Sequence, residues 1–267
     1  MAGHQRMVPY GYATLQNLMK NVPVEYDIFS YAWNNQSESR DIPSHPHLLS
    51  TPDIIDKLGD RSVLMNQREY IEPIWRDYPL NDVIHYNLFA KFMGQILAFM
   101  LALEKWQPKL QEYDFIVRSR WDILVDQHSV NLMINNKNPK QFFTKSVTMY
   151  YGHPQISGDT IYGPRELWFS TLLPIDRSIK KIYAQSIIQH DRIRELKTKP
   201  LQHLDQKFIE YVLKNRWFSS HSIWGMLFQN DYISIDNAGE SYPLGEGLLE
   251  VDPEHVNAGV VMVKGGR

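Results

Sequence analysis

The chain has 267 residues, enough to bury a substantial core in one large domain or two small ones. Its net charge is −2 and it contains no basic block, which argues against nucleic acid or a charged membrane surface as a partner. Because the chain has no cysteine, disulfides, thiolate metal sites and thiol nucleophiles are excluded.

The N-terminal residues lack the apolar core of a signal peptide. The longest apolar stretch, at 88–106, is interrupted by Lys91 and Gln95. This pattern predicts a buried amphipathic helix and not a transmembrane segment. The expected location is therefore the cytoplasm.

The first half of the chain predicts alternating helices and strands. They are a helix at 12–22, a strand at 25–33, a helix at 51–59, a strand at 62–67 and a helix at 81–110. A polar, proline-broken loop separates the first strand from the second helix. That second helix should start with Thr51 as N-cap and Pro52 in first position, and end at Gly59. Asn81 or Asp82 is the expected cap of the long helix.

The second half continues this alternation. Strands are predicted within 112–127, at 141–150 and at 231–236, and helices at 166–181 (across Pro174), 204–217 and 222–230. Strands separated by helices indicate an α/β layered fold. In such folds the ligand crevice lies beyond the carboxyl ends of the strands.

A charged cluster follows the apolar part of "EYDFIVRSRWDILVDQ" (112–127). Arg118, Arg120 and Asp122 alternate along the chain and would share one side of a strand. One interpretation is an internal ion-pair network among these groups and Asp126. The other is a site for a phosphorylated ligand, because guanidinium groups suit phosphate oxygens and a carboxylate can hold a divalent cation. Spacing alone does not choose between them.

Several segments, in order, resemble a family of glycosyltransferase-like proteins with a type A fold, found in bacterial polysaccharide loci and large viruses. They are "GHQR" (3–6), "YDIFSYAWN" (26–34), "YDFIVRSRWDILV" (113–125), "ISGDTIYGPRELW" (156–168) and "SSHSIWGMLFQNDYISI" (219–235). The resemblance implies one domain at 1–236, with a mixed, mostly parallel sheet between flanking helices. Its first strand would be missing or very short. Residues 237–267 would form an irregular extension with a possible edge strand.

The resemblance implies a nucleotide-sugar donor bound at the carboxyl edge of the sheet, and a glycan, lipid-linked or protein acceptor. Donor contacts would come from Gly3, Arg6, Trp33, Arg118, Arg120 and His221. In the family an acidic pair usually holds Mg²⁺ or Mn²⁺ against the diphosphate. Here Arg120 and Asp122 occupy that pair, so Asp122 is the remaining metal ligand and metal dependence is open. A fixed guanidinium could itself neutralise the leaving diphosphate.

Several of these candidate residues also have a purely structural interpretation. Gly3 and Arg6 could belong to a frayed terminus, and a histidine near a helix entrance, such as His221, is commonly structural. Asp159 is the first choice for the general base of an inverting transfer, and Asp205 is the second. A loop aspartate is otherwise a common turn or cap residue.

Two function classes follow. The first is a glycosyltransferase, and the second is a non-catalytic binding or structural module that has lost the metal-binding carboxylate pair. A phosphate-ester hydrolase is a weaker third, because no second metal site can be assembled. No histidine spacing forms a zinc ligand frame, and the sequence holds no nucleophile elbow, P-loop or dinucleotide-binding glycine motif.

Overall fold

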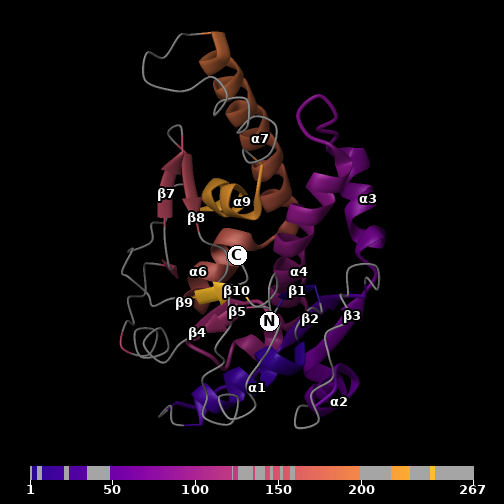
Figure 1. Cartoon of the computed structure of the whole chain (residues 1–267), viewed down its shortest axis with the longest axis vertical. Coiled ribbons are helices and arrows are strands. Elements are labelled where there is room, and N and C mark those ends of the chain that lie inside the picture. Colours follow the sequence, from indigo (N-terminus) through magenta and orange to yellow (C-terminus); the bar gives the residue numbers. More distant parts are fainter. Residues whose placement is uncertain are drawn as a thin grey trace, which may run out of the picture.

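A computed structural model describes most of the chain (Figure 1). The residues described are 2–4, 8–20, 24–34, 49–121, 123–125, 135, 142–144, 147–150, 153–156, 160–198, 218–228 and 241–243. They form a mixed helix-and-sheet structure, as predicted. The predicted single, mostly parallel sheet is wrong for the described residues, because their strands form a small parallel sheet and separate antiparallel ones.

The N-terminal part is a β-α-β-α-β unit. Its elements are β1 (Ala2–His4), α1 (Val8–Met19), β2 (Ser30–Trp33), α2 (Thr51–Leu58) and β3 (Ser62–Met65), with a single 3₁₀ turn at Gly59–Arg61. The three strands are parallel in the order β1-β2-β3. Their carboxyl ends therefore lie at one edge of the sheet. The first strand is present with three residues, and Gly3 pairs with Ala32.

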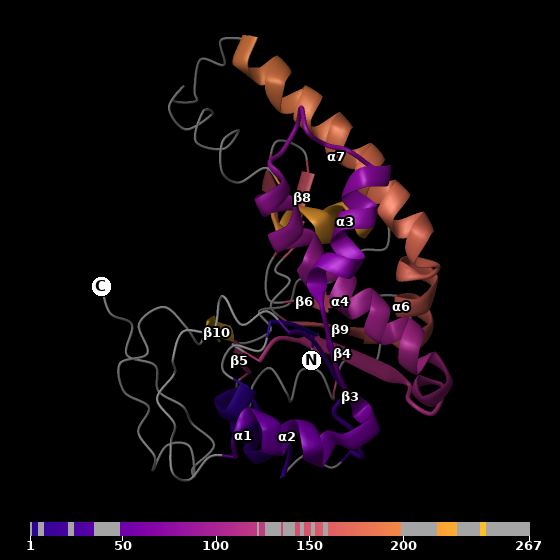
Figure 2. The same cartoon turned by 90° about the vertical axis from the view of Figure 1, so that its right-hand side faces the viewer.

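Helices cover both faces of this sheet. Residues of α1 and α2 form one small core with Trp121, whereas the opposite face carries Tyr31 and Trp33 and packs on α4 (Tyr86–Leu110). Figure 2 shows α1 and α2 below the strands and α4 above them. All four residues of β2 are buried, as expected for a central strand with a helix layer on each side.

Helix α4 is the centre of the main core. Twelve of its residues are buried, among them Ile96, Ala98 and Met100 at 0% exposure. By length and composition alone α4 could cross a membrane, but 56% of its most apolar window is buried inside the protein. Helix α3 (Gln67–Asp77), capped by Asn66, packs beside α4.

A second three-stranded sheet has the order β4-β9-β6, and both of its pairings are antiparallel. Its strands are β4 (Phe115–Ser119), β6 (Phe143–Thr144) and β9 (Thr160–Pro164). Two short antiparallel pairs join β5 (Ile123–Val125) to β10 (Ser241–Pro243), and β7 (Val147–Tyr150) to β8 (His153–Ile156). Part of the segment predicted as a C-terminal extension thus pairs with β5.

The other helices among the described residues are α6 (Arg165–Leu172), α7 (Ile175–Thr198) and α9 (Ser220–Leu227). Aromatic side chains connect them to the second sheet and to α4. The indole of Trp168 donates to the Ile116 carbonyl at 3.0 Å, and its ring lies 4.8 Å from Phe99 and 6.0 Å from Trp224. Both sheets therefore share one continuous core through α4.

Several predicted boundaries are wrong. Ser50, not Thr51, caps α2, because its hydroxyl accepts from the Asp53 amide while the Asp53 carboxylate accepts from the Ser50 amide. Pro52 is consequently the second helical residue. Gly59 ends the helix as predicted, with a φ of 56°.

Other differences concern helix lengths and breaks. The long helix begins after His85, not at 81 or 82, and the first helix spans 8–19 instead of 12–22. The helix predicted across Pro174 is two helices, because the extended residue before a proline cannot continue a helix. Helix α3 was not predicted, and strand β2 begins at Ser30, later than expected.

Some predictions lie outside the described residues. They concern Arg6, Asp122, Asp126, Asp159, Asp205, the loop within 35–48, the helix at 204–217, the strand at 231–236 and most of 237–267.

Candidate functional site

The carboxyl end of β4 carries the two arginines of the charged cluster. Arg118 is 1% exposed, and its guanidinium lies 5.5 Å from the centre of the Trp224 ring. Arg120 directly follows the strand and is partly exposed. Arg118 shares its strand face with buried Ile116, whereas Val117 on the other face is 46% exposed. The two arginines therefore differ in access to solvent, and Arg120 is the more exposed of the two.

Strand β9 lies beside this end of β4. Ser119 pairs with Thr160, and their hydroxyl oxygens are 3.4 Å apart in a buried position. Thr160 comes directly after Asp159 in the sequence. The pairing thus brings 118–119, at the end of β4, beside 160–161, which follow the candidate base Asp159 in the sequence.

Helix α9 packs on the same region. Ser219 caps it, with reciprocal hydrogen bonds to Ser222 at 3.2 and 2.7 Å, and His221 is its second residue. His221 is partly buried. Trp224 lies one turn further along α9, and its ring contacts Arg118. The start of α9, which carries His221, is therefore about one helical turn away from the residue that contacts Arg118. At the other end of α9, the Lys181 ammonium donates to the Leu227 carbonyl at 2.6 Å, a favourable place for a cation.

The carboxyl edge of the parallel sheet carries the N-terminal candidates. Gly3 lies inside β1, and Trp33 is the last residue of β2. Trp33 is 1% exposed, and its indole donates to the Gly94 carbonyl at 2.9 Å. Its ring also meets Tyr31 edge-on at 6.0 Å. These contacts place Trp33 in the core, whereas Asn34, which follows it, is exposed.

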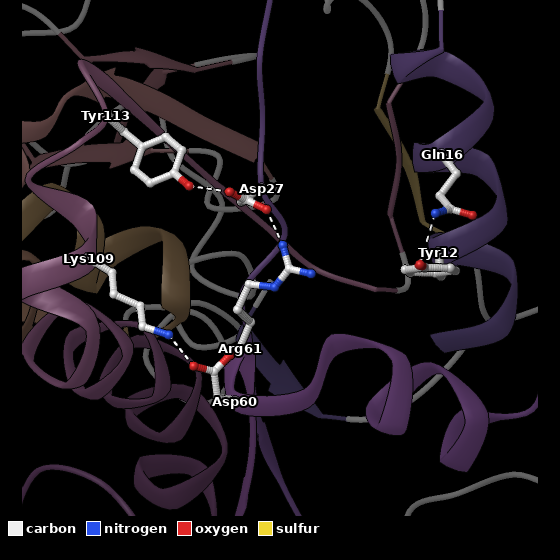
Figure 3. A network of polar contacts seen from close by, with 7 residues as sticks. All are labelled: Tyr12, Gln16, Asp27, Asp60, Arg61, Lys109 and Tyr113. Atoms are coloured by element: carbon white, nitrogen blue, oxygen red, sulfur yellow. Dashed lines mark hydrogen bonds and ion pairs between the residues drawn. The ribbon is translucent and has the colours of Figure 1, made fainter.

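A polar network lies where β2, β3 and β4 begin, at the end of these strands opposite to their carboxyl ends (Figure 3). Asp27 precedes β2 and accepts from both Arg61, before β3, and Tyr113, before β4. Burial, followed by the hydrogen bond to Asp27, raises the pKa of Tyr113 to about 12. A neighbouring contact joins Lys109 to Asp60 and lowers the pKa of that carboxyl group. The network links strand starts, away from the edge where α/β folds bind ligands.

The described residues at the end of β4 do not suit a divalent cation. They offer guanidinium groups and hydroxyls, and cations of this class prefer carboxylate and carbonyl oxygens. Across the described part of the chain, no group of three or more histidine, aspartate or glutamate residues could hold a metal ion. Asp122, the predicted metal ligand, lies outside the described residues.

Sequence reasoning missed two residues of this region, Trp121 and Trp224. Both are at most 1% exposed. The ring of Trp224 lies against Arg118, and Trp121, which follows Arg120, donates to the Ser30 hydroxyl. The signal available for Trp121 was a large apolar residue between Arg120 and Asp122, where an exposed loop would favour polar residues. Trp224 gave no local signal, because only the packing of α9 on β4 defines its role.

Comparisons of the chain with family models, curated proteins and solved structures gave no match.

Proposed function

We propose that this protein is a glycosyltransferase with a type A fold, transferring a sugar from a nucleoside-diphosphate donor to a glycan, lipid-linked or protein acceptor. The sequence resemblance to that family spans about residues 3 to 235, with its segments in the family's order. The proposal takes its main support from this order, because each segment is loosely defined by itself.

The arrangement of the N-terminal unit is consistent with nucleotide binding. Three parallel strands in sequential order, with helices on both faces, direct their carboxyl ends to a single edge. Folds of this class bind nucleotides at that edge. The residues at and after these ends include Gly3 and Asn34, and in the family the matching segments contact the donor.

Arg120 is the proposed contact for the diphosphate. It follows β4 directly, is partly exposed, and presents a planar group that can donate two parallel hydrogen bonds to phosphate oxygens. Arg118, buried beneath Trp224, would add positive potential without direct contact. His221, at the start of α9, is a second diphosphate contact in this proposal.

In an inverting transfer the acceptor hydroxyl oxygen bonds to the anomeric carbon as the bond from that carbon to the diphosphate oxygen breaks. The nucleoside diphosphate leaves with the electron pair, and Asp159 takes the proton of the hydroxyl. Arg120 compensates the negative charge that grows on the leaving oxygen.

The test is release of UDP or GDP across a panel of nucleotide-sugar donors, together with calorimetric titration of each nucleoside diphosphate with and without Mn²⁺. Arg120→Ala should weaken nucleotide binding by about tenfold or more, since a charge-assisted contact contributes about 1.5–3 kcal/mol. Arg76→Ala is the matched control, because that side chain is 78% exposed on α3 and pairs with Asp77. Asp159→Asn should abolish transfer and leave donor binding unchanged.

The burial of Arg118 favours one alternative, a non-catalytic module that keeps the fold. A guanidinium held under a tryptophan ring can serve the core alone. The same experiment separates the two functions. If no nucleoside diphosphate binds and no donor is turned over, the transferase proposal is rejected.

A further inference from the structure

Trp121 belongs to a different core from the strand that precedes it. Whereas β4 contributes Ile116 to the main core around α4, Trp121 lies with four residues of α1 and α2 in the small core under the parallel sheet. It is 1% exposed there. The chain therefore passes from one core to the other within a few residues of Arg120.

Three contacts hold Trp121 in place. Its indole nitrogen donates to the Ser30 hydroxyl at 3.3 Å, at the start of β2. Its ring lies 6.3 Å from that of Tyr12, tilted by 49°. Its carbonyl oxygen lies so close to α1 that a Cβ atom on Gly11 would be only 2.3 Å from it. The group that excludes a side chain at position 11 is a backbone carbonyl, which cannot move aside as the end of a flexible side chain can.

These contacts matter because the β4–β9 pairing ends at Ser119 and Thr160. Arg120 lies one residue beyond the last paired position, and Trp121 is the next residue along the chain. An indole with a buried, hydrogen-bonded N–H and a ring packed on two helices is a rigid anchor. Its neighbour Arg120 is consequently tied to the N-terminal unit as well as to β4.

We propose that Trp121 is a positioning residue, which clamps the turn after β4 onto the β-α-β-α-β unit and so sets where Arg120 stands relative to the carboxyl edge of the parallel sheet. The clamp is a property of the fold. Its consequence for nucleotide binding rests on the proposed function. The expected ligand is the diphosphate of a nucleotide, held between Arg120 and that edge.

The clamp is tested with Trp121→Phe, which keeps a ring and removes the N–H, and Ser30→Ala, which removes the acceptor. Trp106→Phe is the matched control, because that indole is also buried and donates to a backbone carbonyl, that of Asp60, at 3.2 Å. Amide hydrogen exchange of peptides covering 115–125 is the readout, with peptides from α7 as the internal reference.

Trp121→Phe and Ser30→Ala should each raise exchange in 115–125 by about tenfold relative to the reference, as expected for a local opening that has become easier. The double variant should exchange no faster than the more affected single variant, because both changes remove the same hydrogen bond. Trp106→Phe should leave 115–125 unchanged. Unchanged exchange in the first two variants, or an equal rise in the control, would overturn the clamp.

Calorimetric titration with UDP and GDP tests the positioning consequence. Trp121→Phe should weaken binding of the preferred nucleotide by about tenfold, and Trp106→Phe should not, because a site loses affinity when its supporting residues loosen. Wild-type affinity in Trp121→Phe, with faster exchange, would overturn the positioning role. If the wild-type chain binds neither nucleotide, the proposed function is what fails, and the exchange data still decide the clamp.

Discussion

The guanidinium of Arg118 lies 5.5 Å from the centre of the Trp224 ring, and both side chains are almost completely buried. The sequence suggested that the end of β4 presents both arginines to a ligand. In the structure Arg118 is buried, and Arg120 is partly exposed. Arg118 belongs to the contact between β4 and α9, and Arg120 is the proposed ligand contact. This division makes the two positions separable by mutation.

Arg118→Ala should destabilise the fold by about 3 kcal/mol, because it removes a large buried side chain and its contact with Trp224. Arg76→Ala should change the free energy of unfolding by less than about 0.5 kcal/mol, since Arg76 is exposed. Urea unfolding monitored by circular dichroism measures both. Equal stability of the two variants would show that the buried guanidinium contributes nothing to the core.

Gly11→Ala should destabilise the protein by about 1–3 kcal/mol, in spite of the better helix propensity of alanine, because its Cβ would meet the Trp121 carbonyl at 2.3 Å. Gly94→Ala is an informative comparison. The nearest atom there is the Gln67 side-chain nitrogen at 2.0 Å, which can move at the cost of its hydrogen bond to Ala90. Thermal unfolding should therefore rank Gly11→Ala as the more harmful change.

Trp33→Phe should lower the free energy of unfolding by about 1 kcal/mol, the usual contribution of one hydrogen bond, because the indole N–H to Gly94 is lost. Nucleotide affinity should be unchanged, since Trp33 is 1% exposed and lies within the core. Parallel unfolding and calorimetric titrations check both parts. A loss of affinity without a loss of stability would show that Trp33 contacts the donor after all.

Tyr113 should make stability fall at alkaline pH. Its pKa is raised from 10.0 to about 12 in the folded protein, so the unfolded chain gives up this proton first. The contribution of Tyr113 is thus complete below pH 10 and is lost as the pH rises through 12. Tyr113→Phe should show a shallower decline than the wild type when unfolding is measured at intervals between pH 9 and 12. Parallel curves for the two proteins would contradict the coupling to Asp27.

Short-range features were predictable from the sequence alone. The end of α2 at Gly59 and the alternation of strands with helices depend on residues that are neighbours in the chain. The same local reasoning missed α3, since Pro73 within it reads as a break. It also merged α6 with α7, because the apolar spacing continued across Pro174.

Tertiary structure decided the burial of the candidate site residues that the structure describes. Arg118 and Arg120 have the same side chain and lie two residues apart, but Arg118 is buried against Trp224 of α9 whereas Arg120 is partly exposed. No local pattern records where α9 packs. Trp33 and Trp121 likewise owe their burial to α4 and α1, which reach them from other parts of the chain. Residue type and order set which chemistry this protein could perform, whereas exposure to a ligand depends on long-range packing that only the folded chain defines.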